Sequence, residues 1–225
     1  RSFKNNYYYL KEHALLYYPY YGKNLKNIGD AINPLMFEYF TNKKTINSNS
    51  VINILGKTKY FFIGSVLDYI DKNSVVLGAG FISDDSKVKK PKKIYCVRGP
   101  KTRQKFISNN IFCPDFYCDP GLLISKFFPI KTPKKYKYGI VPHYVDKDNS
   151  ILNILLNNPD FKILNIENEY DVFLKELNQC EYVFSSSLHG IIFSISYSIP
   201  CGWIKFSNNV YGNDFKFFDF FESID

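Results

Sequence analysis

The segment SSSLHG, residues 185–190, places one of the three histidines of the chain directly after three serines. A histidine can hold a proton near neutral pH when an anion lies beside it. Apolar residues before the segment predict a strand and those after it a helix, and a helix N-terminus offers backbone N–H groups to phosphate or carboxylate. His189 is thus a candidate general acid, and the hydroxyls of Ser185, Ser186 and Ser187 are candidate substrate donors. The same pattern is also typical of a simple helix cap.

Three further polar residues follow predicted strands. Arg98 precedes a Gly-Pro helix start, where a guanidinium can bind a carboxylate or phosphate through a forked pair; the alternative is a surface arginine. His143, in VPHY, is a candidate phosphate ligand or second acid–base group, with a structural role as the alternative. Asp30, which follows Asn27 and Gly29, is either a base for a hydroxyl or the N-cap of its helix.

The elements that must position these residues alternate along the chain. Strands are predicted over 13–20, 59–67, 74–81, 94–99, 138–146, 161–166, 181–187 and 201–206, and helices within 27–40 and over 100–109, 150–158, 170–180 and 189–198. Short apolar strands that alternate with helices are typical of parallel sheets. The sequence therefore predicts an α/β fold of two Rossmann-like halves, each with a parallel sheet.

A segment rich in proline and lysine, residues 127–139, interrupts this alternation and predicts a linker. We therefore expect an N-terminal half over 1–130 and a C-terminal half over 131–225. Ligands of such sheets bind beyond the carboxyl ends of the strands. The polar residues named above would then line one cleft between the halves. The same cleft would be lined by turns whose backbone can approach a ligand closely, at Gly29, Gly64, Ser65, Gly78 and Gly80.

The charge of the chain favours an anionic partner. Twenty-nine basic residues stand against 21 acidic ones, a formal net charge of +8. Such a surface suits a phosphorylated small molecule, a membrane surface or a nucleic acid. Lysines crowd residues 87–93, a run typical of a solvated loop. No nucleic-acid-binding motif accompanies it, so we expect no nucleic-acid partner.

The cysteines and acidic residues predict no metal site. The five cysteines form no zinc-binding spacing with each other or with histidine, and no acidic cluster suited to magnesium lies near the glycines. Cysteines in apolar contexts indicate reduced thiols, and we expect a cytoplasmic location. No apolar run approaches the ~20 residues of a membrane span, which leaves peripheral association as the form of membrane contact.

Seven segments occur in an order that resembles one known family. They are NIGDAINP, IGSVLD, VVLGAGF, VRGPKT, CDPGLL, GIVPHY and SSSLHGIIFSISYSIP. Together they resemble the polysaccharide pyruvyl transferase family, in particular its exopolysaccharide ketal-pyruvyl-transferase branch, and the ending FKFFDFFESI is similar to that branch as well. The resemblance spans about Tyr17 to Ile224.

This resemblance implies an architecture similar to that of GT-B glycosyltransferases. It also implies transfer of the enolpyruvyl group of phosphoenolpyruvate to two hydroxyls of a sugar or a lipid-linked oligosaccharide, which makes a cyclic pyruvate ketal without a further cofactor. The half over 131–225 would hold phosphoenolpyruvate and the half over 1–130 the acceptor.

Residue roles follow from this chemistry, which needs an acid, a base and anion-binding groups. His189 would protonate the methylene carbon of phosphoenolpyruvate, Asp30 would act as base for the acceptor hydroxyl, and His143 would be a second acid–base group. Many members of the family carry arginine where this chain has Ser187, although the ketal-transferase branch often has serine there. Arg98 is expected to supply the anion contact that this exchange removes.

Two other functions remain as alternatives. A GT-B glycosyltransferase that uses a nucleotide-sugar would have the same fold, but it needs residues that hold the ribose or diphosphate, and Lys205 alone is poor evidence for them. A non-catalytic, glycan-binding member of the family is the other alternative.

Overall fold

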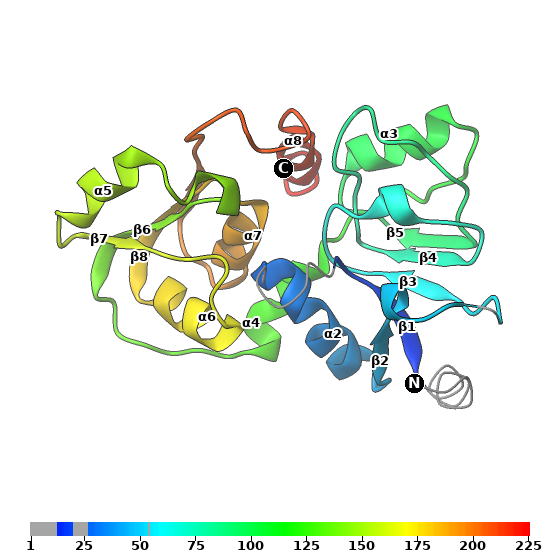
Figure 1. Cartoon of the computed structure of the whole chain (residues 1–225), viewed down its shortest axis with the longest axis horizontal. Coiled ribbons are helices and arrows are strands. Elements are labelled where there is room, and N and C mark those ends of the chain that lie inside the picture. The colour runs from blue at the N-terminus through cyan, green and yellow to red at the C-terminus, as the bar shows by residue number, and fades with distance from the viewer. Residues whose placement is uncertain (1–12, 20–26, 54) are drawn as a thin grey trace. The chain divides into compact units, whose positions relative to one another are not determined.

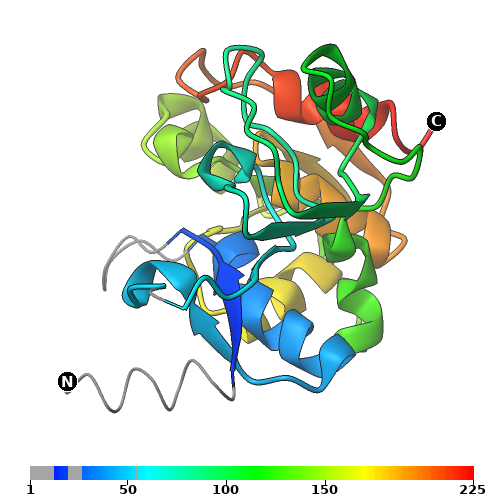
Figure 2. The same ribbon diagram turned by 90° about the vertical axis from the view of Figure 1, so that its right-hand side faces the viewer.

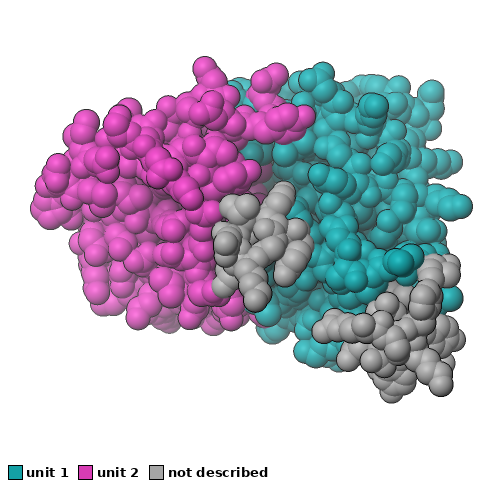
Figure 3. Space-filling model, in the orientation of Figure 1, with its two compact units in different colours: residues 1–20, 30–120, 214–225 teal, residues 21–29, 121–213 magenta. Residues whose placement is uncertain are grey.

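The computed structural model describes residues 13–19, 27–53 and 55–225. The chain divides into two compact units, coloured separately in Figure 3: unit 1 comprises residues 1–20, 30–120 and 214–225, and unit 2 comprises 21–29 and 121–213. Each unit contains one sheet in which every strand pair is parallel. The predicted fold class of two α/β halves with parallel sheets is confirmed, whereas the cleft between them stays a prediction.

The sheet of unit 1 has the strand order β2-β1-β3-β4-β5 (Figure 1). Its strands are β1 (Ala14–Tyr17), β2 (Thr45–Asn47), β3 (Lys59–Phe61), β4 (Ser74–Leu77) and β5 (Lys93–Cys96). β1 is buried along its whole length, as expected for a parallel strand with both faces covered. β2 was not predicted, because its three residues are too few to show a period.

Three α-helices accompany this sheet: α2 (Ile28–Thr41), which begins with the last two residues of unit 2, α3 (Pro100–Ser108) and α8 (Phe215–Phe221). α3 starts with proline at its first position, as predicted. α8 was not predicted, and its residues were assigned to the C-terminal half. In the structure α8 belongs to unit 1 and lies beside α3 (Figures 1 and 2).

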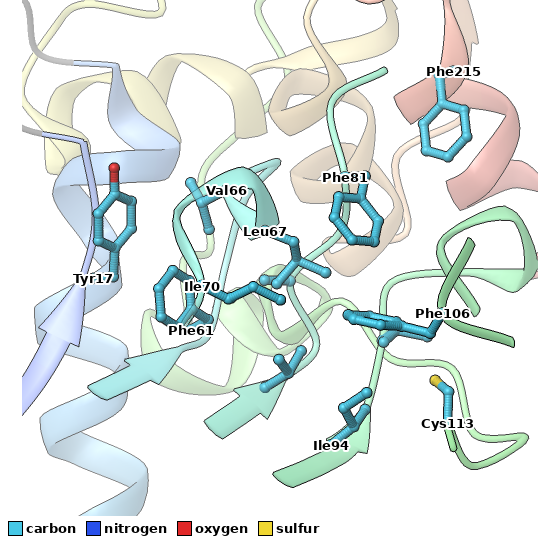
Figure 4. Close-up of a cluster of buried hydrophobic side chains, with 13 residues drawn as sticks. Tyr17, Phe61, Val66, Leu67, Ile70, Phe81, Ile94, Phe106, Cys113 and Phe215 are labelled. Atoms are coloured by element: carbon cyan, nitrogen blue, oxygen red, sulfur yellow. The ribbon is translucent and has the colours of Figure 1, made fainter. Parts of the chain in front are cut away.

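The core of unit 1 explains the place of α8. Phe215 from α8, Phe106 from α3 and Phe81 from the segment after β4 belong to one cluster of buried side chains (Figure 4). The rings of Phe81 and Phe106 lie 5.1 Å apart. Burying such aromatic side chains contributes about 1.5–3 kcal/mol each, which binds the end of the chain to this unit.

The sheet of unit 2 has the strand order β7-β6-β8-β9. Its strands are β6 (Tyr136–Val141), β7 (Phe161–Ile163), β8 (Cys180–Ser185) and β9 (Cys201–Trp203), and its helices are α4 (Ile124–Phe127), α5 (Ser150–Leu156), α6 (Tyr170–Asn178) and α7 (Leu188–Ser196). α7 contacts β8 and β9, the two strands that it connects. This is the strand–helix–strand crossover that parallel strands require.

The segment 127–139 lies inside unit 2, and the division between the units falls between Pro120 and Gly121. The Tyr197 hydroxyl donates to the Phe128 carbonyl at 2.6 Å, and the rings of Phe128 and Tyr170 are 4.9 Å apart. These contacts attach the segment to helices α6 and α7 of the same unit. Proline and lysine mark an exposed connection here, and the boundary itself carries no such signal.

Candidate active-site residues in the two units

The turn between β8 and α7 in unit 2 has the predicted strand-to-helix form. Ser185 is completely buried, and its hydroxyl lies 2.7 Å from the Ser187 carbonyl and 3.1 Å from the Val141 carbonyl. The same hydroxyl accepts a hydrogen bond from the Ser187 backbone N–H at 3.0 Å. Ser185 therefore holds the turn together, a different role from the substrate donor that the sequence predicted.

Ser186 joins this turn to the loop after β6. Its hydroxyl donates to Asp146 Oδ2 at 3.0 Å and accepts from the His143 backbone N–H at 2.8 Å. The other oxygen of Asp146 accepts from the Ser207 hydroxyl. The donor of Ser186 is thus used within the protein, and its predicted role at the substrate is corrected in the same way as that of Ser185.

Ser187 differs from the two serines before it. It is the N-cap residue of α7, but its side chain makes no capping hydrogen bond. Its hydroxyl makes no hydrogen bond with any other residue that the structure describes. Ser187 therefore remains the candidate donor among the three serines.

His189 lies in the first turn of α7 and is held by packing on two sides. Its ring stacks on Phe193, with 5.7 Å between the centroids. A Cβ atom added to Gly29 would lie 2.1 Å from the imidazole ring, so the ring rests directly on the Gly29 backbone. Gly29 was predicted to admit a ligand, and in this structure it admits the imidazole instead. The packing fixes the orientation of His189, as an acid–base group requires.

His143 has a clear structural function at the end of β6. It is the N-cap of the short 3₁₀ helix Tyr144–Asp146, and its Nδ1 accepts from the Val145 backbone N–H at 3.4 Å. The catalytic role of His143 stays a prediction.

In unit 1, Arg98 follows β5 and its side chain is completely buried. Its Nε donates to Asp219 at 2.8 Å, one terminal nitrogen donates to the Ser65 hydroxyl, and the other donates to the Phe81 carbonyl at 2.6 Å. A guanidinium enclosed by protein groups has no face for a forked pair with a substrate. The predicted role of Arg98 in substrate binding is therefore corrected to an internal hydrogen-bond network, whereas Ser65 only accepts a bond from Arg98 and its role at the substrate stays a prediction.

Asp219 completes this network and caps a helix at the same time. It accepts hydrogen bonds from the backbone N–H and the hydroxyl of Thr102, each at 2.7 Å. Thr102 lies in the first turn of α3, whose N-cap residue is Gly99 and offers no side chain. A carboxylate from the end of the chain thus takes the position of a capping side chain.

Two predicted glycines make room for protein groups. A Cβ on Gly80 would lie 2.4 Å from the guanidinium carbon of Arg98, and one on Gly78 would lie 2.5 Å from both the Cys118 carbonyl oxygen and a ring carbon of Pro120. Gly78 also has a φ of +112°, which favours glycine. The close approach that the sequence predicted is real, but the approaching groups belong to the chain itself.

Asp30 lies in the first turn of α2, where its carboxylate makes no hydrogen bond or ion pair with the described residues. The N-cap alternative is not supported, because Asn27 accepts from the Gly29 backbone N–H at 3.0 Å and takes that position. Burial raises the pKa of Asp30 to about 7, and the charge of Lys216 partly opposes the rise. A carboxyl group that titrates near neutrality is suited to proton transfer at that pH.

The side-chain amide of Asn33 holds the loop after β3, which lies near Asp30. Asn33 of α2 donates to the Ile63 carbonyl at 2.9 Å and accepts from the Ile63 N–H at 3.2 Å. The next residue, Gly64, has a φ of +106°, and Asp30 Oδ1 lies 3.9 Å from the position that its Cβ would occupy. A side chain added at Gly64 would therefore lie in van der Waals contact with the Asp30 carboxylate.

Lys216 is a candidate functional residue that the sequence analysis missed. It lies on α8 and is 9% exposed. Burial and the nearby Arg98 charge lower the pKa of Lys216 to about 8, while Asp214 and Asp30 act in the opposite direction. The signal was the segment FKFFDFF, in which Lys216 and Asp219 are three residues apart and so share one face of an otherwise aromatic helix.

Replacing Asp30 with asparagine should stabilise the protein at pH 8 and not at pH 4. The folded carboxyl keeps its proton up to a pKa of about 7, whereas the unfolded one loses it near 3.8. The folded state thus binds more protons between these values, so the stability of the wild type falls as pH rises through this window. Asparagine removes this loss, by on the order of 1–3 kcal/mol after allowance for solvent screening.

Urea unfolding of the wild type and Asp30→Asn at pH 4 and pH 8 measures this difference. The two proteins should have nearly equal free energies of unfolding at pH 4. An equal difference at both pH values would show that Asp30 has an ordinary pKa.

The sequence also made predictions about metal sites, membrane spans and cysteines. Among the residues that the structure describes, no three His, Cys, Asp or Glu side chains form a group that could hold a metal ion. None of the described helices has both the length and the apolar character to cross a bilayer. The five cysteines are free thiols, as predicted, and burial raises the pKa of Cys96 to about 12. The cytoplasmic location and the lack of a metal requirement stay predictions.

Comparisons with known proteins show to which family the chain belongs. The family model described as "Polysaccharide pyruvyl transferase" matches residues 5–208. An uncharacterized protein of Acanthamoeba polyphaga mimivirus is 32% identical over 222 residues, which cover 91% of this chain and 73% of the relative. No solved structure matches the chain. Since the family model covers nearly all of the sequence, the chain belongs to the polysaccharide pyruvyl transferase family.

Proposed function

We propose that the protein transfers the enolpyruvyl group of phosphoenolpyruvate to two hydroxyls of a sugar acceptor and forms a cyclic pyruvate ketal. The observation that carries this proposal is the family match over residues 5–208, which includes the β8–α7 turn and its histidine. The packing of His189 between Gly29 and Phe193 supports a role that needs a fixed imidazole.

In the proposed reaction a proton adds to the methylene carbon of phosphoenolpyruvate, and an oxocarbenium-like centre forms at the adjacent carbon. The first sugar hydroxyl forms a bond to that centre and loses its proton to a base. The bond to the phosphate oxygen then breaks, and phosphate leaves. A second hydroxyl forms the last carbon–oxygen bond and closes the ketal ring. One hydroxyl proton replaces the proton that the acid delivered, and the other leaves with phosphate.

His189 is the proposed acid and Asp30 the proposed base. Asp30 is the next residue of α2 after Gly29, and its pKa of about 7 allows it to accept a proton from a hydroxyl near neutral pH. The hydroxyl of Ser187 and the N-terminal turn of α7 are proposed to contact an anionic group of the donor. The acceptor is a sugar of a polysaccharide or of a lipid-linked oligosaccharide.

The test is incubation of the purified protein with phosphoenolpyruvate and a panel of glycans. Phosphate release and the methyl signal of a pyruvate ketal in the ¹H NMR spectrum of the glycan should both depend on the acceptor. Nucleotide-sugars tested in parallel should yield no nucleoside diphosphate. If they do, the protein is a glycosyltransferase; glycan binding without turnover of either donor would identify a non-catalytic member of the family.

We expect the activity to survive EDTA, because acid–base groups of the chain supply each proton transfer of the proposed reaction. Initial rates of phosphate release should be equal before and after dialysis against EDTA. Magnesium-loaded protein serves as the control. Loss of turnover that one divalent ion restores would contradict this expectation.

A further inference from the structure

Lys216 is a buried cation that makes no hydrogen bond or ion pair with the residues that the structure describes. The side chain is 9% exposed. Its Nζ lies 5.5 Å from the centroid of the neighbouring Phe217 ring. Burying an ammonium that makes no hydrogen bond or ion pair raises the free energy of the folded state, because the group loses its water shell without a direct contact that compensates for the loss.

The acidic residue nearest in sequence on the same helix face is already fully used. Asp219 accepts from Arg98 Nε and from both the N–H and the hydroxyl of Thr102. The positive charge of Arg98 is thereby matched, and its guanidinium is enclosed. Lys216 is left as a cation of this cluster that makes no ion pair with a described carboxylate, and Asp214 and Asp30 act on it only through longer-range electrostatic attraction.

Asp30 does not neutralise Lys216 either. No ion pair joins the two side chains, although each influences the pKa of the other. With a pKa of about 7, Asp30 is protonated in a large fraction of molecules at neutral pH. Lys216, with a pKa of about 8, is largely charged at the same pH. The ammonium of Lys216 is therefore charged and has no direct carboxylate contact among the described residues, so it can donate hydrogen bonds to an added anion.

We propose that Lys216 binds an anionic group of the substrate, either a phosphate or a carboxylate. This inference rests on the proposed function, since phosphoenolpyruvate carries both groups. The enclosed Arg98 does not make such a contact.

Calorimetric titration of the full chain at pH 7 tests the proposal. The ligands are phosphoenolpyruvate, inorganic phosphate and pyruvate, and the variant is Lys216→Gln. The Kd for phosphoenolpyruvate should rise by roughly 10- to 100-fold, the range for a lost hydrogen bond to a charged group. Whichever of phosphate and pyruvate loses affinity in the variant identifies the group that Lys216 holds.

Lys101→Gln is the matched control. The Lys101 side chain is 39% exposed and pairs with Glu222 at 3.1 Å. The substitution removes the same charge from the same unit. The Kd of this variant should stay within about twofold of the wild type, as expected for a surface ion pair. Equal Kd values for the wild type and Lys216→Gln would overturn the inference while leaving the proposed function intact. Failure of the wild type to bind any of the three anions would overturn both, whereas binding of phosphate but not phosphoenolpyruvate would overturn the proposed function alone.

A measurement on the wild type covers the case in which Lys216→Gln does not fold. Acetic anhydride labels lysines according to their accessibility and pKa, and peptide mass spectrometry locates each label. Saturating phosphoenolpyruvate should protect Lys216 at least fivefold and leave Lys101 unchanged. Equal labelling of Lys216 with and without phosphoenolpyruvate would overturn the inference. So would the absence of any label on Lys216 in the free protein.

Discussion

The His189→Ala variant is expected to turn over ~10²–10⁴-fold more slowly than the wild type, the range typical of a lost general acid. The proton on the methylene carbon has to be delivered before a hydroxyl can attack. Phosphoenolpyruvate binding should weaken much less, because the imidazole acts in the transition state more than in the ground state. Single-turnover phosphate release and calorimetric binding measure the two effects separately.

The matched control is His13→Ala, which makes the same substitution at a histidine that the proposed reaction does not use. Circular dichroism and the melting temperature will show that both variants fold, since His189→Ala also removes the stacking on Phe193. Near wild-type turnover by folded His189→Ala would make the histidine a packing residue of α7. His143 would then become the next acid to test.

The Asp219→Ala variant should lose about 3–5 kcal/mol of its free energy of unfolding, because it leaves the Arg98 guanidinium charged and buried without its partner. It also removes the hydrogen bonds that cap α3 at Thr102. Urea unfolding followed by circular dichroism measures this loss.

Two further variants separate the causes of this effect. In Arg98→Met/Asp219→Leu both charges are gone, so the loss should be smaller than in Asp219→Ala, although the cap of α3 is still missing. Glu222→Ala breaks the exposed pair with Lys101, which joins the same two helices, and should cost about 0–1 kcal/mol. A similar cost for Asp219→Ala and Glu222→Ala would contradict the importance of the buried pair.

Much of the candidate site could be placed from the sequence because it lies on local patterns. The SSSLHG segment predicted a strand that ends and a helix that begins, and β8 ends at Ser185 while α7 begins at Leu188. Gly29 and His189 were both singled out as functional. What the sequence did not show is that the imidazole rests on this glycine, since the two residues are far apart in the chain.

The roles of the charged residues were the least predictable part. Arg98 follows β5, and ligands of parallel sheets bind beyond the carboxyl ends of the strands. Its residue type and its position therefore did not indicate that its side chain is buried. Its partner Asp219 lies 121 residues away, on a mostly aromatic helix that the sequence analysis did not predict. Lys216 was not predicted as a functional residue, because it lies on the same helix.

The sequence by itself determined the fold class, the order of most strands and helices, and the family, because short apolar strands, Gly-Pro helix starts and ordered motifs are local features of the chain. Only the tertiary structure decided that α8 belongs to unit 1, that Arg98 is paired inside the protein and that Lys216 is buried without an ion pair to a described residue. These facts depend on which distant residues share a core. Burial and pairing of a charge are set by its neighbours in space, and its neighbours in sequence do not reveal them.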